Sequence, residues 1–130
     1  MEILVPFAVN PVSEQAVRAA IGLFGSDDRV QIIAVHMTGG KDAPAEIAAS
    51  EIESMGARQP ASVEAEIYQV ESGADSRSAV RDMIEEIVES RDIDLVVLGY
   101  EEKSIFEQLF ETDTTERMLQ THNLPVLLVP

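Results

Sequence analysis

The chain has 130 residues, a formal net charge of −15 and no cysteine. This length fits one domain spanning residues 1–130, and the lack of cysteine excludes disulfides, thiolate metal sites and a cysteine nucleophile. No apolar stretch approaches the roughly 20 residues of a membrane span, and the apolar start has neither a basic leader nor a cleavage site, so we expect a cytoplasmic protein. The charge argues against nucleic acid and membranes as partners, because binding to these polyanions depends on lysine and arginine.

The acidic residues spread along the whole chain, whereas Lys41 and Lys103 are its only lysines. At about 1 M ionic strength the Debye length shrinks to roughly 3 Å, so repulsion among the carboxylates is largely screened. We therefore interpret the composition as adaptation to a halophilic cytoplasm. An ordinary acidic protein is the alternative.

Short apolar runs alternate with helical patterns in chain order. The pattern predicts strands at residues 2–7, 30–37, 62–70, 93–100 and 125–130, separated by helices that end near Gly25 and Gly56, cover residues 76–90 and follow Asp113. The third strand alternates Glu64 and Glu66 with apolar residues, as in an edge strand with one wet face. This alternation of elements implies an α/β fold with a parallel sheet covered by helices through right-handed crossovers.

Ligands of such sheets bind beyond the carboxyl ends of the strands, where the winding direction reverses. The segments expected there are residues 8–13, 36–41, 73–76 and 99–113. None contains the glycine-rich P-loop or the three spaced glycines of a dinucleotide site. The first loop, "AVNPVS", also lacks the phosphate-binding residues of a flavodoxin and the acidic residues of a response regulator.

Two stretches carry a resemblance to a known family. The opening "ILVPFAVNPVSEQAVRAA" and the closing "DLVVLGY", "TERML" and "LPVLLVP" are similar to the corresponding elements of universal stress proteins of the UspA type, over essentially the full length. The resemblance implies a single-domain, adenine-nucleotide alpha-hydrolase-like fold. It has an open parallel sheet of five strands in the order 3-2-1-4-5, with helices on both faces. It also implies a homodimer formed through the last strand.

The ATP-binding branch of that family has an aspartate after the first strand and the motif Gly-x-x-Gly, about nine residues, then Gly-Ser/Thr. In this chain Ala8 stands at the aspartate position. Gly99 matches the first motif glycine, but Glu102 stands at the second, and Thr112 and Asp113 stand at the final pair. The resemblance therefore implies a degenerate nucleotide site that keeps one of the three motif glycines.

The physical chemistry of these substitutions opposes phosphate binding. Glycine lets consecutive backbone N–H groups approach an anion, whereas Glu102 and Thr112 add side chains there. Asp113 caps the helix N-terminus that would otherwise attract phosphate. A carboxylate about 4 Å from a phosphate charge costs on the order of 1 kcal/mol in water and about 4 at an effective dielectric of 20. We expect no cofactor; the alternative is ATP or AMP held by Gly99, the backbone near Val35 and the Thr112 hydroxyl.

Other polar residues are expected to have structural roles. His36 ends the second strand and His122 lies on the last helix, and neither has a histidine neighbour that would indicate a base or a metal ligand. Ser76 and Ser78 are interpreted as helix caps rather than as a nucleophile or a phosphate clamp. The carboxylates of residues 101–113 do not have the spacing of a calcium loop, and we interpret them as solvated surface. We predict no catalytic residue and no metal site.

The last seven residues, "LPVLLVP", are apolar on both sides of a strand that should lie at a sheet edge. Twofold pairing with a second subunit would cover its apolar residues Val126, Leu127, Leu128 and Val129. Cover by the chain's own last helix is the alternative. The leading hypothesis is a non-enzymatic, dimeric stress-response protein that acts through unidentified protein partners, and the alternative is a nucleotide-binding module or slow ATPase.

Overall fold

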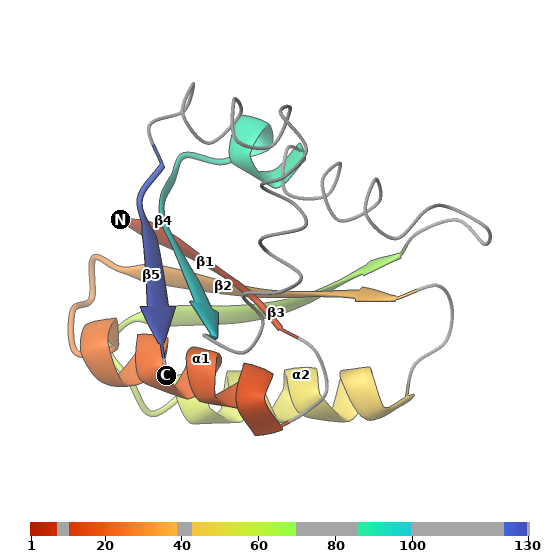
Figure 1. Cartoon of the computed structure of the whole chain (residues 1–130). Helices are drawn as coiled ribbons and strands as arrows, with labels where there is room; N and C mark the ends of the chain where they lie inside the picture. Colours follow the sequence, from red (N-terminus) through yellow and green to blue (C-terminus); the bar gives the residue numbers. More distant parts are fainter. Residues whose placement is uncertain (8–10, 39–42, 70–85, 100–123, 130) are drawn as a thin grey trace.

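A computed structural model describes residues 1–7, 11–38, 43–69, 86–99 and 124–129 (Figure 1). The bounds of its strands are β1 Glu2–Pro6, β2 Gln31–Thr38, β3 Ser62–Gln69, β4 Ile93–Gly99 and β5 Val126–Val129. The bounds of its labelled helices are α1 Pro11–Phe24 and α2 Ala43–Gly56. Residues 86–90 are also helical. Each predicted strand is confirmed, with ends that differ by about one residue.

The five strands form one sheet in the order β3-β2-β1-β4-β5, and every pair is parallel. This is the order implied by the resemblance. The central strand β1 lies between β2 and β4. The chain first adds β2 and β3 on one side of β1 and then adds β4 and β5 on the other side, so the winding direction reverses at β1. The carboxyl ends of β1, β2 and β4 therefore define the place where a ligand of this α/β fold is expected.

Helices cover both faces of the sheet, as predicted. Figure 1 shows α1 and α2 side by side on one face, where Ile3 and Val5 of β1 pack in the core cluster that these helices share. Leu4 of the same strand packs in a second cluster that contains Ile87 and Val88 of the helical residues 86–90. Alternate residues of one strand thus serve opposite core layers. Burying each such side chain contributes about 1.5–3 kcal/mol.

Both labelled helices end where glycine is required. The N–H of Gly25 donates to the carbonyl of Ile21 at 2.7 Å, and a Cβ on Gly25 would lie 2.3 Å from that oxygen. A Cβ on Gly56 would lie 2.2 Å from the Cβ of Val63 on β3. Larger residues would force the end of α1 and the α2–β3 packing apart, so the predicted helix ends at these glycines are confirmed and explained.

The turn between α1 and β2 is held by a local ion pair. The guanidinium of Arg29 donates to both carboxylate oxygens of Asp27, at 3.0 and 2.9 Å, and the backbone N–H of Arg29 donates to Asp27 at 2.9 Å. The side-chain bonds first, and the backbone bond second, lower the pKa of Asp27 from its usual 3.8 to about 2. Because this pair is exposed to water, it orders the turn rather than the core.

The acidic side chains of β3 contact an arginine from outside the strand, which the alternating pattern of β3 does not predict. Arg91, which precedes β4, donates to Glu66 and lies 3.7 Å from Glu64. Tyr68 of the same strand donates to Glu86. The predicted edge position of β3 is confirmed, and these contacts tie its polar side chains to residues 86–91 on one face of the sheet.

Candidate functional site

The candidate site lies at the carboxyl edge formed by β1, β2 and β4. Val35 of β2 is in register with Pro6 of β1, and Gly99 ends β4 next to β5. The structure therefore brings the two described nucleotide-site candidates, Val35 and Gly99, to one edge of the sheet, with β1 between their strands. The other candidates and predicted caps lie outside the described residues: Ala8, Ser76, Ser78, Glu102, Thr112, Asp113 and His122.

An aromatic pair fastens the end of β1 to β2 at this edge. The N–H of Phe7 donates to the carbonyl of Val35 at 2.9 Å, and Nδ1 of His36 lies 2.8 Å from the carbonyl oxygen of Phe7. Since a carbonyl only accepts, this contact requires a proton on Nδ1. The two rings lie 5.3 Å apart at 36°. The backbone is thus fixed immediately before residue 8, the position of the aspartate in the ATP-binding branch.

These contacts define what the edge can offer a ligand. The side chain of Val35 is only 1% exposed and packs in the core layer opposite α1 and α2, so Val35 can present only backbone atoms to a ligand. Its carbonyl already accepts the hydrogen bond from Phe7. The ring of His36 packs against the ring of Phe7, and its Nδ1 contacts the Phe7 carbonyl, which gives this histidine a packing and anchoring role. The sequence offered no signal for this role of Phe7, because a phenylalanine that ends an apolar run is ordinary core.

The described residues contain no group of three or more histidines, aspartates and glutamates placed to hold a metal ion. The carboxylates of residues 101–113 lie outside that part of the chain. Within the described ranges, no helix has the length and apolar character needed to cross a membrane. Among the described residues, the contacts at the edge are the hydrogen bonds and the ring contact of Phe7 with Val35 and His36.

The second predicted functional surface is the edge strand β5. It pairs with β4 from Val96↔Val126 to Gly99↔Val129, and it is the last strand in the sheet order. Val126, Leu127 and Val129 are partly buried, and they pack against the core clusters of the two faces. The predicted position of β5 at the sheet edge is confirmed, while pairing with a second subunit stays a prediction.

The fold and its carboxyl edge define an open α/β protein of the class that binds ligands at the reversal of strand order. The model of the universal stress protein family matches residues 1–130. The chain therefore belongs to the universal stress protein family. No curated protein sequence matches the chain.

Solved structures show the same fold. The universal stress protein from Archaeoglobus fulgidus is 20% identical, with a TM-score of 0.58 and coverage of 100% of this chain and 93% of that one. A structure of the universal stress protein from the same organism in complex with dAMP is 20% identical, with a TM-score of 0.64 and coverage of 100% and 98%. UspA from Lactobacillus plantarum is 15% identical, with a TM-score of 0.64 and coverage of 100% and 97%.

Proposed function

We propose that this chain is a non-enzymatic universal stress protein that does not retain ATP and acts in the cytoplasm as a homodimer through protein partners. The observation that carries the proposal is the composition of the loop after Gly99. Glu102 stands at the second motif glycine, and Thr112 and Asp113 stand at the final pair. Side chains and negative charge thus occupy positions where a phosphate cradle needs bare backbone N–H groups.

The described part of the edge supports this proposal. Phe7 and His36 hold the end of β1 against β2 through their ring contact and two hydrogen bonds. The next residue is Ala8, which lacks the carboxylate found at this position in the ATP-binding branch. The described backbone is therefore fixed up to the residue before Ala8, and an alanine side chain can neither accept a hydrogen bond nor bind a cation.

The homodimer is supported by the edge position of β5 and by its residues. Among its four residues, Val126, Leu127, Leu128 and Val129, none carries a charge. Exposed apolar edges invite pairing with another strand, and twofold pairing of identical segments is the simplest closed solution. The strand would then continue the sheet into the second subunit.

A nucleotide-binding protein or slow ATPase is the second candidate function. It is favoured by the similar Archaeoglobus fulgidus structure in complex with dAMP, which this chain matches over its full length. In this alternative, Gly99, the backbone near Val35 and the hydroxyl of Thr112 would hold ATP or AMP. The two candidates differ in one measurable property, the affinity for adenine nucleotides.

Restoring the motif separates the two candidates. The thermal unfolding midpoint is measured with and without saturating ATP, in molar KCl, for the natural chain and for the variant Ala8→Asp/Glu102→Gly/Thr112→Gly/Asp113→Ser. We expect no ATP-dependent shift for the natural chain and a rise for the restored variant, because a ligand at about 100 times its Kd stabilises by about 2.7 kcal/mol.

A matched control isolates the role of glycine. Glu102→Ala/Thr112→Ala/Asp113→Ala removes the carboxylates without restoring the glycines, and it should remain without a shift. A clear ATP-dependent rise in the natural chain would overturn the proposal and establish the nucleotide-binding alternative.

A further inference from the structure

A hollow lies between the C-terminal parts of α1 and α2, where these helices lead into β2 and β3. Its volume is about 290 Å³, and the described residues that line it are Arg18, Ile21, Gly22, Met55, Arg58 and Gln59. We call it the arginine hollow. The carboxyl edge of the sheet lies near the start of α1, so the hollow is at the opposite end of that helix.

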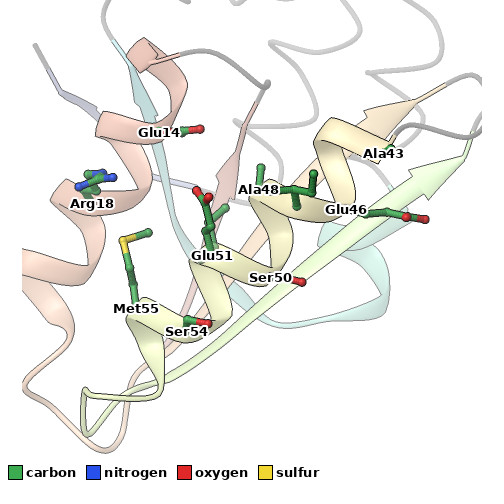
Figure 2. Close-up of a pocket in the computed structure, with 11 residues that line it drawn as sticks. Glu14, Arg18, Ala43, Glu46, Ala48, Ser50, Glu51, Ser54 and Met55 are labelled. Carbon is green, nitrogen blue, oxygen red and sulfur yellow. The ribbon is translucent and has the colours of Figure 1, made fainter.

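Carboxylates lie on one side of the arginine hollow. Figure 2 shows the adjoining groove, of about 690 Å³, which shares Arg18 and Met55 with the hollow. Glu14 and Glu51 line that groove, one helical turn before Arg18 and Met55, respectively. Glu46 also lines the groove and lies farther away, in the first turn of α2. None of the described residues that line the hollow itself is acidic, so the charges that these residues present to a ligand are two guanidinium groups.

Both of these arginines lack a carboxylate partner. The chain has 24 acidic residues against 9 lysines and arginines, and Arg29 and Arg91 form ion pairs with carboxylates. Arg18 and Arg58 are the other arginines within the described ranges, and neither forms an ion pair or a side-chain hydrogen bond there. Each guanidinium group therefore keeps its five N–H donors for another molecule.

Gly22 leaves open space over the backbone of α1 beside these arginines. Glycine inside a helix is destabilising relative to alanine. The packing of the described chain does not require it here, because a Cβ on Gly22 would meet no atom within 4 Å. Ile21, which is 8% exposed, and the partly buried Met55 flank this space with apolar surface. The hollow thus combines two cationic groups with an apolar recess.

We propose that the arginine hollow binds a small organic carboxylate that carries a short apolar chain. The carboxylate accepts hydrogen bonds from Arg18 and Arg58, whose planar guanidinium groups match its two oxygens. The apolar chain lies over Gly22, between Ile21 and Met55. The volume of about 290 Å³ is at the lower end of the range of about 300–1,000 Å³ for small-molecule sites, which favours a ligand with few non-hydrogen atoms.

The net charge of −15 opposes the approach of any anion. At about 0.15 M salt the Debye length is roughly 8 Å, so distant carboxylates are largely screened, whereas a charge-assisted hydrogen bond acts at about 2.7–2.9 Å. Binding therefore depends on direct contact with the arginines and on the apolar recess. We expect a Kd of about 1 mM for a ligand of this size.

Titration with hexanoate tests the site. The backbone amide shifts of the isotope-labelled full chain are followed by NMR in about 0.15 M and about 1 M KCl. We expect saturable shifts centred on residues 18–22 and 55–59, with tighter binding at the lower salt. Acetate has the charge without the chain, and hexan-1-ol has the chain without the charge. Each should bind about tenfold more weakly than hexanoate.

Gly22→Leu separates binding from folding. The leucine side chain would fill the space that the chain of hexanoate needs, so saturable binding should be lost. The thermal unfolding midpoint should not fall, because leucine is the better helix former and its Cβ meets no atom within 4 Å.

Arginine substitutions test the charged contacts. Arg18→Gln and Arg58→Gln should each raise the Kd for hexanoate by about tenfold, since each removes charge-assisted hydrogen bonds. Arg91→Gln is the matched control. It makes the same change in net charge at a residue that pairs with Glu66 outside the hollow, and it should leave the Kd unchanged.

The absence of saturable shifts at both salt concentrations would overturn the proposal, and so would shifts that do not include residues 18–22 and 55–59. An unchanged Kd in Gly22→Leu, or in both single arginine variants, would also overturn it. Equal affinity for acetate and hexanoate would show unspecific attraction of anions and would contradict the role of the apolar recess. The proposals on nucleotide binding and on β5 do not involve this hollow, so they can fail separately.

Discussion

The two edges of the sheet are opposites in composition. β3 runs for eight residues and places Glu64 and Glu66 on one side, where they meet Arg91. β5 runs for four residues, Val-Leu-Leu-Val, without a charge. Charged side chains on an edge strand discourage pairing with another strand, whereas an apolar edge invites it. The contrast is what the proposed dimer requires, because that dimer pairs through β5 and not through β3.

The largest expected effect is on the free energy of unfolding, and it differs between the interior strands and the edge strands of the sheet. Ile32 of β2 is fully buried, so Ile32→Ala should lower the free energy of unfolding by about 2–5 kcal/mol. Ile67 on β3 is only partly buried, and Ile67→Ala should cost less than about 2 kcal/mol. Urea titration in constant salt measures both. Equal costs would mean that β3 is as deeply packed as the interior strands.

The next largest effect on stability comes from the close packing of α2 on β3. Gly56→Ala should cost about 1–3 kcal/mol, because the new Cβ would lie 2.2 Å from the Cβ of Val63. Gly22 is the control, since a Cβ there meets nothing within 4 Å, and Gly22→Ala should stabilise α1 by about 0.5–1 kcal/mol. Thermal unfolding compares the two. A harmless Gly56→Ala would contradict the close packing of α2 on β3.

A matched pair of charged substitutions tests the difference between the edges. Leu127→Lys on β5 should weaken the proposed β5 dimer by about tenfold or more, because the side chain at position 127 packs against the core layer on one face of the sheet, where the lysine charge would be buried beside the paired strands. Ile67→Lys on β3 makes the same kind of change at the other edge and should leave the oligomeric state unchanged. Light scattering coupled to size exclusion gives the mass of each. An effect of Ile67→Lys equal to that of Leu127→Lys would remove the contrast between the edges.

Arg91 contributes a smaller effect at the β3 edge. Arg91→Met keeps much of the apolar stem but removes the charge between Glu64 and Glu66. Because the pair is partly exposed, the loss should be about 0.5–1 kcal/mol at low salt and should vanish near 1 M salt. Urea titrations at the two salt concentrations measure it. A loss that does not depend on salt would show that Arg91 acts through packing.

The smallest effect concerns the turn before β2. Arg29→Met should raise the pKa of Asp27 from about 2 toward its usual 3.8. Since the folded-state pKa is depressed, the stability contributed by Asp27 is present above about pH 4 and is lost as the pH falls through about 2. Carboxyl chemical shifts followed by NMR report the midpoint directly. An unchanged midpoint in the variant would mean that the backbone N–H of Arg29 alone holds the carboxylate.

The sequence predicted the elements well because their signals are local. Apolar runs mark β2 and β4, and Gly25 and Gly56 mark the ends of the helices. The strand order followed from the family resemblance rather than from any local pattern. Edge positions were predictable for β3 from its alternation, since only a strand with one wet face tolerates glutamate at every second position.

Contacts between distant residues were not predictable in the same way. Nothing near Phe7 in the sequence indicates that its carbonyl meets His36, because the contact depends on the register between β1 and β2. The pairing of Arg91 with Glu66 joins residues 25 positions apart. Of the candidate nucleotide site, the sequence could name the substituted positions but not the geometry of the edge.

We propose that the carboxyl edge of this universal stress protein does not hold a nucleotide. The most direct measurement is a mass-spectrometric inventory of the small molecules released when the protein, purified natively in molar KCl, is denatured. We expect an inventory without adenine nucleotides. Near-stoichiometric ATP or AMP would contradict it and would show that the loop with Glu102, Thr112 and Asp113 still builds a pocket.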